Sequence, residues 1–257
     1  MTQTNLPVAT VVLVHAAWAD ASSWNKIIPP LQRGGLQALA VQIPLSSLSD
    51  DATTLQRFLK RVSGPAVLVG HSYGGAVITA AGSGNPNVKA LVYIAAMAPD
   101  EGETVGELLH RAAPHASAPA LVPDEDALLW MSAKGFADAV AHESSADDAL
   151  LMAATQKPIA IKCVQEQMTK PAWKEKPSWF LVAERDRMIA PETQRFMAHR
   201  TGGHVLAMEV DHTPLGSAPD RVVAIITEAV DAILHEAFPD PRRIGWRVTR
   251  RELRRRV

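Results

Sequence analysis

The first hundred residues alternate between short apolar runs and segments with helical periodicity. The apolar runs are rich in β-branched residues and predict buried strands, the longest of which is Val88–Ala96. Asp50–Val62 repeats its apolar residues at helical spacing and predicts a helix. This succession of strands and helices is typical of a doubly wound, mostly parallel sheet, and it predicts the α/β fold class. The other early strands are expected at Thr10–Val14, at Gln37–Ile43 and in the run that begins at Val67.

The pattern changes at residue 99 and returns near residue 177. The intervening stretch contains short helical segments, including one expected at Asp124–Trp130, and five prolines interrupt them. This stretch predicts an inserted helical lid over one end of the sheet. Strands are expected again at Ser178–Ala183 and Val205–Val210, followed by a long helix at Ala218–Phe238. We therefore expect residues 1–98 and 177–238 to form the α/β core, residues 99–176 the lid, and residues 239–257 a basic C-terminal extension.

Composition narrows the class of protein. Of the 257 residues, 47% are hydrophobic and 21% are charged, which is typical of a soluble globular protein. The early apolar run Val8–Val14 follows no Lys or Arg and is too short to cross a bilayer, so we expect neither a signal peptide nor a membrane span. The one cysteine, Cys163, has no partner for an internal disulfide and fits a cytoplasmic location.

The net charge of −1 conceals an uneven distribution of charge. Residues 239–257 contain eight arginines against Asp240 and Glu252, a net charge of +6, which leaves −7 on the other 238 residues. An acidic body argues against nucleic acid as a partner of the whole protein. We expect the basic extension to carry no chemistry, because runs of like charge are usually solvated.

A serine flanked by glycines is the strongest motif. In GHSYGG at residues 70–75, a β-branched apolar run precedes the serine and an Ala/Val/Ile-rich helical segment follows it. A serine in this context is expected on a sharp strand-to-helix turn, which raises its hydroxyl above the end of a parallel sheet. The glycines are needed because a Cβ at their positions would collide with the turn or with the packed helix. Ser72 is therefore the candidate nucleophile.

Two further residues follow late strands whose carboxyl ends should reach the same edge of the sheet. These residues are Asp186 and His212. Asp211 is adjacent to His212, but neighbouring side chains of an extended chain point to opposite sides, so Asp211 is a poor partner for the ring. The chain order Ser72, Asp186, His212 is the order expected for a hydrolase of this architecture. His212 would act as general base, and Asp186 would orient its ring.

The oxyanion formed in such a reaction requires hydrogen-bond donors. We expect one from the backbone N–H of Tyr73, next to the nucleophile, and the other from Ala17, in the loop after the first strand. His15 and His71 lie beside these groups, and we expect core or supporting roles for both. The substrate pocket is expected to be lined by Trp18, Met97, Trp130 and Met131.

Taken together, these motifs resemble the α/β-hydrolase superfamily, and most of all small bacterial hydrolases similar to plant methylesterases and hydroxynitrile lyases. The resemblance extends from about residue 8 to residue 238. It implies an α/β-hydrolase fold with a helical cap, the triad Ser72, Asp186 and His212, no cofactor or metal, and a small-molecule ester as substrate. It rests on VVLVHAAW at 11–18, GHSYGG at 70–75, APDEGE at 98–103, ERDRMIAP at 184–191 and DH at 211–212.

The sequence departs from this resemblance at several positions. Ala16 stands where such proteins usually have glycine, no lysine follows His212 as it does in hydroxynitrile lyases, and the arginine-rich extension is additional. The missing lysine disfavours cyanohydrin cleavage. A serine in place of an aspartate at the turn argues against haloalkane dehalogenase or epoxide hydrolase chemistry.

We therefore expect an esterase that acts on small apolar esters through an acyl-Ser72 intermediate. The same triad also suits a C–C hydrolase, a lactonase or an acyltransferase. From a different class, the fold can serve as a small-molecule receptor without turnover. Nothing in the sequence indicates an oligomeric state.

Overall fold

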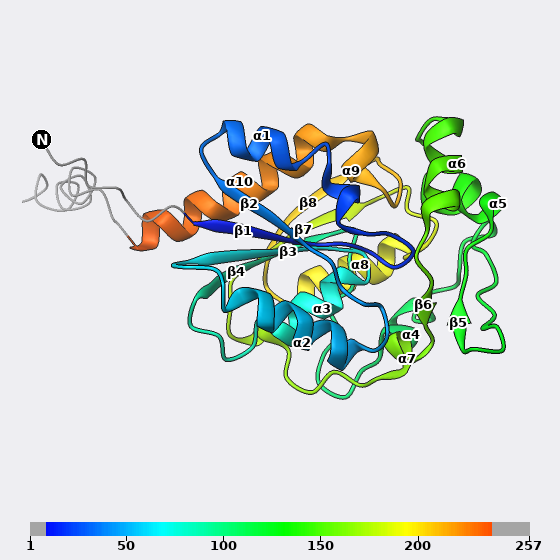
Figure 1. The fold of residues 1–257 in the computed structure, drawn as a ribbon, viewed down its shortest axis with the longest axis horizontal. Coiled ribbons are helices and arrows are strands. Elements are labelled where there is room, and N and C mark those ends of the chain that lie inside the picture. The colour runs from blue at the N-terminus through cyan, green and yellow to red at the C-terminus, as the bar shows by residue number, and fades with distance from the viewer. Residues whose placement is uncertain (1–8, 238–257) are drawn as a thin grey trace, which may run out of the picture.

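Six parallel strands form the centre of the protein (Figure 1). The computed structural model describes residues 9–237, and its main sheet has the strand order β2-β1-β3-β4-β7-β8. Every pair of neighbouring strands in this sheet is parallel, which confirms the predicted α/β fold class. The chain passes from β1 to β2 on one side and then to β3 on the other side of β1, so the order reverses there. The strands are β1 (Thr10–Val14), β2 (Gln37–Val41), β3 (Ala66–His71), β4 (Val88–Ile94), β7 (Ser178–Ala183) and β8 (His204–Met208).

Helices cover both faces of this sheet. α1 and α10 pack on one face, and α2, α3 and α8 pack on the other. Successive residues of a strand point to opposite faces, so Leu13 of β1 joins the first layer and Val14 joins the second. Both faces are thereby buried, which explains why the central strands are apolar at nearly every position. The helices are α1 (Ile28–Arg33), α2 (Leu48–Leu59), α3 (Gly74–Ala81), α8 (Pro191–Arg200) and α10 (Pro219–Ala237), with a 3₁₀ helix at Ala21–Trp24 and a short α9 (Pro214–Ser217).

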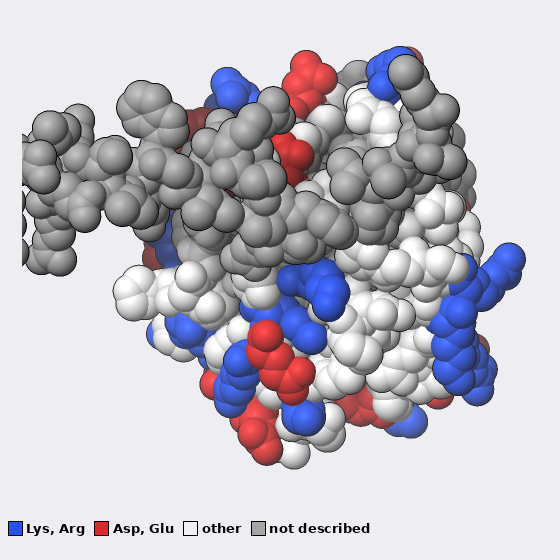
Figure 2. All heavy atoms as spheres, turned by 90° about the vertical axis from the view of Figure 1, so that its left-hand side faces the viewer, with Lys and Arg blue, Asp and Glu red and all other residues white. Residues whose placement is uncertain are grey.

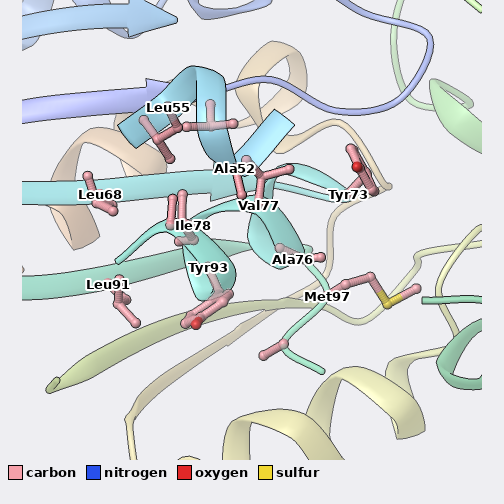
Figure 3. Close-up of a cluster of buried hydrophobic side chains, with 14 of the residues drawn as sticks. Ala52, Leu55, Leu68, Tyr73, Ala76, Val77, Ile78, Leu91, Tyr93 and Met97 are labelled. Atoms are coloured by element: carbon pink, nitrogen blue, oxygen red, sulfur yellow. The ribbon is translucent and has the colours of Figure 1, made fainter. Parts of the chain in front are cut away.

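The core beneath α2 and α3 is closely packed around Tyr93 (Figure 3). Apolar side chains of these two helices meet those of β3 and β4 there. The ring of Tyr93 stacks on Phe180 with ring centroids 4.3 Å apart, and its hydroxyl forms a 2.8 Å hydrogen bond with Thr79 of α3. The buried hydroxyl is thereby satisfied. This packing fixes α3, whose first turn follows directly after Ser72.

Residues 99–176 connect β4 to β7, and we call them the cap segment. Figure 1 shows its labelled elements beyond one end of the main sheet, whereas residues 172–174 pack against α3. Residues 99–176 are those expected from the sequence to form the lid, and we propose that they do so. The cap segment contains α4 (Val105–Leu109), β5 (Leu128–Leu129), α5 (Ala133–Gly135), a π-helical turn (Phe136–Val140), α6 (Ala146–Thr155), β6 (Ile159–Ala160), α7 (Lys162–Gln165) and a 3₁₀ helix (Ala172–Lys174).

One element of the cap segment differs from the sequence-based expectation. The helix predicted at Asp124–Trp130 is absent, and Leu128–Leu129 instead form β5, which pairs antiparallel with β6. The Asp124 carboxylate accepts the N–H groups of Asp126 and Leu128 at 3.0 and 2.9 Å. Such a side chain stabilises a turn in competition with a helix, and the prediction was wrong for this reason.

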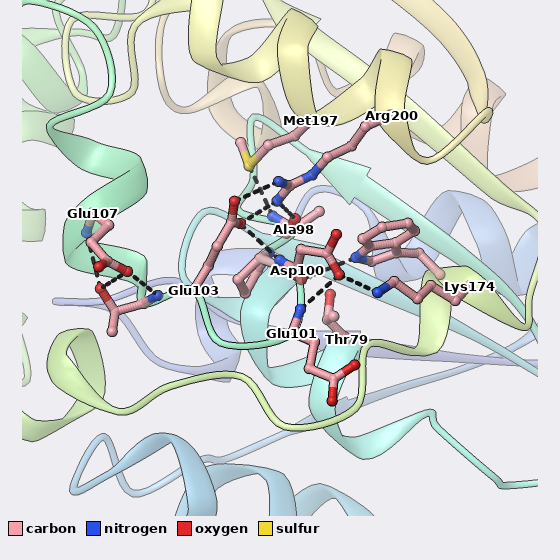
Figure 4. A network of polar contacts seen from close by, with 12 residues as sticks. Thr79, Ala98, Asp100, Glu101, Glu103, Glu107, Lys174, Met197 and Arg200 are labelled. Carbon is pink, nitrogen blue, oxygen red and sulfur yellow. Dashed lines mark hydrogen bonds and ion pairs between the residues drawn. The ribbon is translucent and has the colours of Figure 1, made fainter.

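A polar network joins the cap segment to α8 (Figure 4). The Arg200 guanidinium, at the end of α8, donates to both carboxylate oxygens of Glu103 at 2.7 and 2.6 Å and to the carbonyl of Ala98 at 2.6 Å. These hydrogen bonds hold the pKa of Glu103 below its ordinary value. Asp100 pairs with Lys174, so the beginning and the end of the cap segment are also joined to each other. The network fixes the point where the cap segment leaves the sheet.

The face opposite the cap segment carries charges of both signs (Figure 2). Lys and Arg side chains lie there close to Asp and Glu side chains.

No helix within residues 9–237 is both long enough and apolar enough to cross a membrane. The basic extension expected at residues 239–257 lies outside the described residues.

Candidate active site

Ser72 lies at the turn between β3 and α3. Its φ of 52° falls in the left-handed region, which costs energy for a residue other than glycine. A Cβ on Gly74 would come within 2.5 Å of the Val14 carbonyl oxygen, and one on Gly75 within 2.4 Å of the Met97 carbonyl oxygen. Neighbouring backbone atoms therefore require glycine at both positions that follow Tyr73 in the motif. The close packing maintains the strained turn that presents the serine hydroxyl.

The structure brings the three predicted catalytic residues together at the carboxyl end of the sheet. His212 Nε2 lies 2.9 Å from Ser72 Oγ, and His212 Nδ1 lies 2.7 Å from Asp186 Oδ2. All three residues are almost buried, with exposed fractions of 8% for Ser72, 4% for His212 and 3% for Asp186. A carboxylate accepts hydrogen bonds, so Nδ1 carries the proton and the Nε2 lone pair faces the serine hydroxyl. This geometry can take the proton of Ser72 during attack on a carbonyl carbon.

Further donors fix the orientation of the Asp186 carboxylate. Its Oδ1 accepts the N–H groups of Met188 and Ile189 at 2.7 and 2.9 Å. Its Oδ2, which also faces His212, accepts the side-chain amide of Gln194 at 2.7 Å. No sequence pattern indicates Gln194, because its place beside the carboxylate depends on how α8 packs. The buried carboxylate thus has a hydrogen-bond donor on each oxygen besides the imidazole.

The residues expected to supply the oxyanion donors lie in the same cavity as the serine. Ala17, in the loop after β1, and Tyr73 both line the cavity that Ser72 lines. Among the described residues, neither backbone N–H donates a hydrogen bond to another group. Both N–H groups are therefore available to a ligand, as an oxyanion site requires.

Two buried neutral histidines hold the loops of the site. His15 Nε2 accepts the N–H of Ile43 at 3.2 Å, so its Nδ1 carries the proton and donates to the Ala16 carbonyl at 2.9 Å. His71 Nε2 donates to the carbonyl of His212 at 2.7 Å. Burial lowers the pKa of His15 to about 4 and that of His71 to about 3. Both rings thus form hydrogen bonds with backbone groups of the site, in agreement with the supporting roles expected for them.

A buried carboxylate holds the side chain of Tyr73. The Tyr73 hydroxyl donates to Asp51 Oδ2 at 2.7 Å, and the Leu45 N–H donates to Asp51 Oδ1 at 2.7 Å. Asp51 lies in the first turn of α2, is fully buried, and has its pKa raised by that burial. The sequence does not mark this residue as part of the site, because an aspartate in a first helical turn is ordinarily an exposed charge that interacts favourably with the helix dipole.

Two cavities meet at the candidate site. One has a volume of about 130 Å³ and a mostly apolar wall, and the other has a volume of about 240 Å³ and a mixed wall. Ala17, Trp18 and His212 line both cavities. Trp18 and Met97, two of the expected pocket residues, line the smaller cavity. Within residues 9–237, no group of three His, Cys, Asp or Glu side chains is placed to hold a metal ion.

The other two expected pocket residues, Trp130 and Met131, line neither cavity. Trp130 is 51% exposed, and its indole N–H donates to Asp124 at 2.9 Å. Met131 is buried in a separate apolar cluster with Phe136. Leu129 faces the smaller cavity instead, and its neighbour Trp130 points away because consecutive residues of an extended chain point to opposite sides. The expectation for these two residues was therefore wrong.

The parallel sheet, the helices on both of its faces and the cap segment inserted after β4 define a protein of the α/β-hydrolase class. A comparison with protein families supports the same assignment. A model of the alpha/beta hydrolase family matches residues 11–225, and the chain belongs to this family.

Two curated relatives are hydrolases. The carbendazim hydrolyzing esterase of a Nocardioides species is 32% identical over 119 residues, which are 41% of this chain and 49% of that esterase. The alpha/beta hydrolase nvfD of Aspergillus novofumigatus is 26% identical over 244 residues, which are 85% of this chain and 95% of nvfD. The chain thus matches about half the length of the first relative and nearly all of the second.

Solved structures of similar fold include a pyrethroid hydrolase from Sphingobium faniae, with a TM-score of 0.75 and 19% identity over 88% of this chain and 98% of the other. Polyneuridine aldehyde esterase has a TM-score of 0.75 and 18% identity, covering 86% and 98% of the two chains. A methylesterase from Arabidopsis has a TM-score of 0.72 and 20% identity, covering 88% and 99%. These likenesses confirm the expected resemblance in fold to plant methylesterases.

Proposed function

We propose that the protein is a serine hydrolase that cleaves carboxylic esters through an acyl-Ser72 intermediate. The observation that carries this proposal is the hydrogen-bonded chain from Asp186 through His212 to Ser72, at the junction of two cavities. The ester as substrate class is supported by the esterases among the relatives and similar structures.

In the acylation step, Ser72 Oγ attacks the carbonyl carbon of the ester while its proton moves to His212 Nε2. The Asp186 carboxylate stabilises the imidazolium that forms. The N–H groups of Ala17 and Tyr73 bind the oxyanion of the tetrahedral intermediate, each contributing roughly 3–4 kcal/mol. The bond from carbon to the alcohol oxygen then breaks, and the alcohol leaves with the proton from His212.

Hydrolysis of the acyl-enzyme repeats this sequence with water as the nucleophile. His212 Nε2 takes a proton from water, whose oxygen attacks the acyl carbon. The bond to Ser72 Oγ breaks, and the serine recovers its proton from the imidazolium. The carboxylic acid leaves, so one ester and one water yield one acid and one alcohol.

Covalent labelling tests the nucleophile and the reaction class together. Treatment with a fluorophosphonate followed by peptide mapping should modify Ser72 in the wild type. Hydrolysis of p-nitrophenyl butyrate should fall by about 10⁴-fold or more in Ser72→Ala and in His212→Ala, because the triad acts as a unit.

His235→Ala is a matched control for the histidine variant, because His235 is exposed on α10. It should hydrolyse the ester at the wild-type rate. Equal rates for wild type and Ser72→Ala would remove Ser72 from the reaction. Tight binding of a small molecule without labelling or turnover would favour a receptor over an enzyme.

A further inference from the structure

The two cavities share His212, the partner of Ser72. Met97 of the core and cap-segment residues such as Leu129 and Ile159 bound the smaller cavity. The 3₁₀ helix at residues 21–24, α6 and α9 bound the larger cavity. Because Ala17, Trp18 and His212 line both, the cavities meet where the carbonyl carbon of an ester would react.

Ser72 distinguishes the two cavities chemically. Ser72 and Tyr73 line only the smaller cavity, whereas His212 lines both. In an acyl-enzyme, the acyl group stays bonded to Ser72 Oγ, and the alcohol leaves with the proton that His212 delivers. On the basis of the proposed function, the smaller cavity therefore takes the acyl group and the larger cavity takes the alcohol.

The dimensions and lining of the smaller cavity restrict the acyl group. Its volume is about 130 Å³, and its wall is formed largely by apolar side chains such as Met97, Leu109, Leu121 and Val164. A cavity of about 150 Å³ holds one benzene ring. A charged or strongly polar acyl group would lose its hydration there without gaining partners. The cavity thus fits a compact, apolar acyl group of about six carbons.

The larger cavity suits a different chemical group. Its volume is about 240 Å³, and Asp20, Lys26 and Asp148 line it together with apolar residues such as Phe136 and Leu215. A hydrogen bond from Ser22 lowers the pKa of Asp20, so this carboxylate is ionised at neutral pH. An alcohol of more than one ring, with hydroxyl, ether or amide groups, matches this mixture of apolar and polar walls.

Trp18 is the largest of the three side chains that line both cavities. Its indole Nε1 donates to the Leu129 carbonyl of the cap segment at 2.9 Å. Its φ of 56° is left-handed, a conformation that is costly for tryptophan and requires support from its surroundings. The hydrogen bond to the cap segment and the apolar contacts on both sides supply that support.

We propose that Trp18 is a specificity-determining residue that limits the size of the acyl group. The substrates are then esters of a compact apolar acid with a larger, partly polar alcohol. Removal of the indole joins the two cavities, so that a larger acyl group can occupy the space on both sides of the reacting carbon.

A pair of isomeric esters tests this assignment. Naphthylmethyl butanoate has a small acyl group and a large alcohol, and propyl naphthylacetate has the same composition with the two sizes exchanged. The wild type should have a kcat/KM at least about tenfold higher for naphthylmethyl butanoate, since two fused rings exceed the smaller cavity. Trp18→Ala should reduce this ratio to about threefold or less by accelerating the naphthylacetate.

Companion variants separate the bulk of the indole from its hydrogen bond. Trp18→Phe keeps most of the bulk but loses the bond to the Leu129 carbonyl, and it should retain the wild-type preference. Trp18→Leu repeats the test with a second smaller side chain in case Trp18→Ala fails to fold. Trp130→Ala is the matched control, because Trp130 is an exposed tryptophan of the cap segment that lines neither cavity. It should leave the ratio unchanged.

The outcomes distinguish this inference from the proposed function. A wild type that hydrolyses both isomers equally, or prefers the naphthylacetate, overturns the assignment of the cavities. A full preference in folded Trp18→Ala and Trp18→Leu overturns the role of Trp18. An absence of Ser72 labelling and of hydrolysis of every ester, p-nitrophenyl esters included, overturns the proposed function itself.

Discussion

In three histidines of the site, the hydrogen-bond partners of each ring determine which nitrogen carries the proton. His15 donates from Nδ1 to a carbonyl, His71 donates from Nε2 to a carbonyl, and His212 donates from Nδ1 to the Asp186 carboxylate. Of these rings, His212 is the one whose lone pair faces a hydroxyl, that of Ser72. The hydrogen bonds of the other two rings are to backbone groups. This difference in partners separates a candidate base from two supporting side chains of the same type.

The burial of His15 predicts a dependence of stability on pH. Its pKa is about 4 in the folded protein and 6.5 ordinarily, so between these values the unfolded chain binds a proton that the folded chain does not. The free energy of unfolding therefore has its full His15 contribution above pH 6.5 and loses it as the pH falls toward 4. We expect a loss of roughly 2–3 kcal/mol between about pH 7 and pH 4.5 from this residue.

Urea unfolding of His15→Gln at the two pH values measures this contribution. The variant should lose about 2–3 kcal/mol less than the wild type on acidification, whatever its stability at pH 7. His199→Gln serves as the control, because His199 is exposed on α8 and should follow the wild type. An identical loss in wild type and His15→Gln would contradict the prediction.

The sequence identified residues of the site where a motif or the end of a strand marks them. Ser72 is marked by its glycines, and Asp186 and His212 each follow a strand. Asp51 and Gln194 carry no such mark, because each reaches the site from the side of a helix. Their contacts depend on how α2 and α8 pack against the sheet, which the local pattern does not specify.

At the scale of elements, long apolar strands were predictable and short cap-segment elements were not. The strands β1 and β7 occupy the ranges expected for them, since burial on both faces makes each a continuous apolar run. The last strand begins and ends earlier than expected, at His204–Met208, because it is an edge strand with exposed residues. β5 is two residues long, and neither helical nor strand periodicity can be read from so short a segment.

The hydrogen bonds of Arg200 should contribute to the free energy of unfolding, because they join α8 to the beginning of the cap segment. Arg200→Met would leave the Ala98 carbonyl and the Glu103 carboxylate without their donor in a mostly buried place, where the Arg200 side chain is 15% exposed. We expect the free energy of unfolding to fall by about 2–3 kcal/mol, because breaking one side of a buried pair leaves the other unsatisfied. Urea denaturation at neutral pH measures the loss.

Lys174→Met provides the comparison within the same network. Its ion pair with Asp100 is much more exposed, with 45% of the lysine side chain accessible, so its loss should cost at most about 1 kcal/mol. Equal losses in the two variants would show that burial does not distinguish these ion pairs.

At the scale of the whole molecule, the candidate site is a consequence of strand order. Ser72 and His212 lie 140 positions apart in the chain, yet their side chains are hydrogen-bonded. The loop after β1 and the turn after β3 lie at the position where the strand order reverses, the usual ligand site of open α/β sheets. The cap segment then encloses that edge, and its side chains form most of the smaller cavity. The sequence predicted this convergence because the strand order follows general rules of connection, whereas the cavity walls depend on packing within the cap segment.

The arginine-rich end of the chain should be dispensable for catalysis. Every residue that lines the two cavities, and every member of the candidate triad, lies within residues 16–216. Removal of residues 241–257 deletes eight arginines and one glutamate, so it should change binding to an anionic matrix. The kcat and KM for p-nitrophenyl butyrate should stay within about twofold of the full chain. A truncated protein that keeps its circular dichroism and its melting temperature but loses turnover would contradict this expectation and assign the extension a part in the reaction.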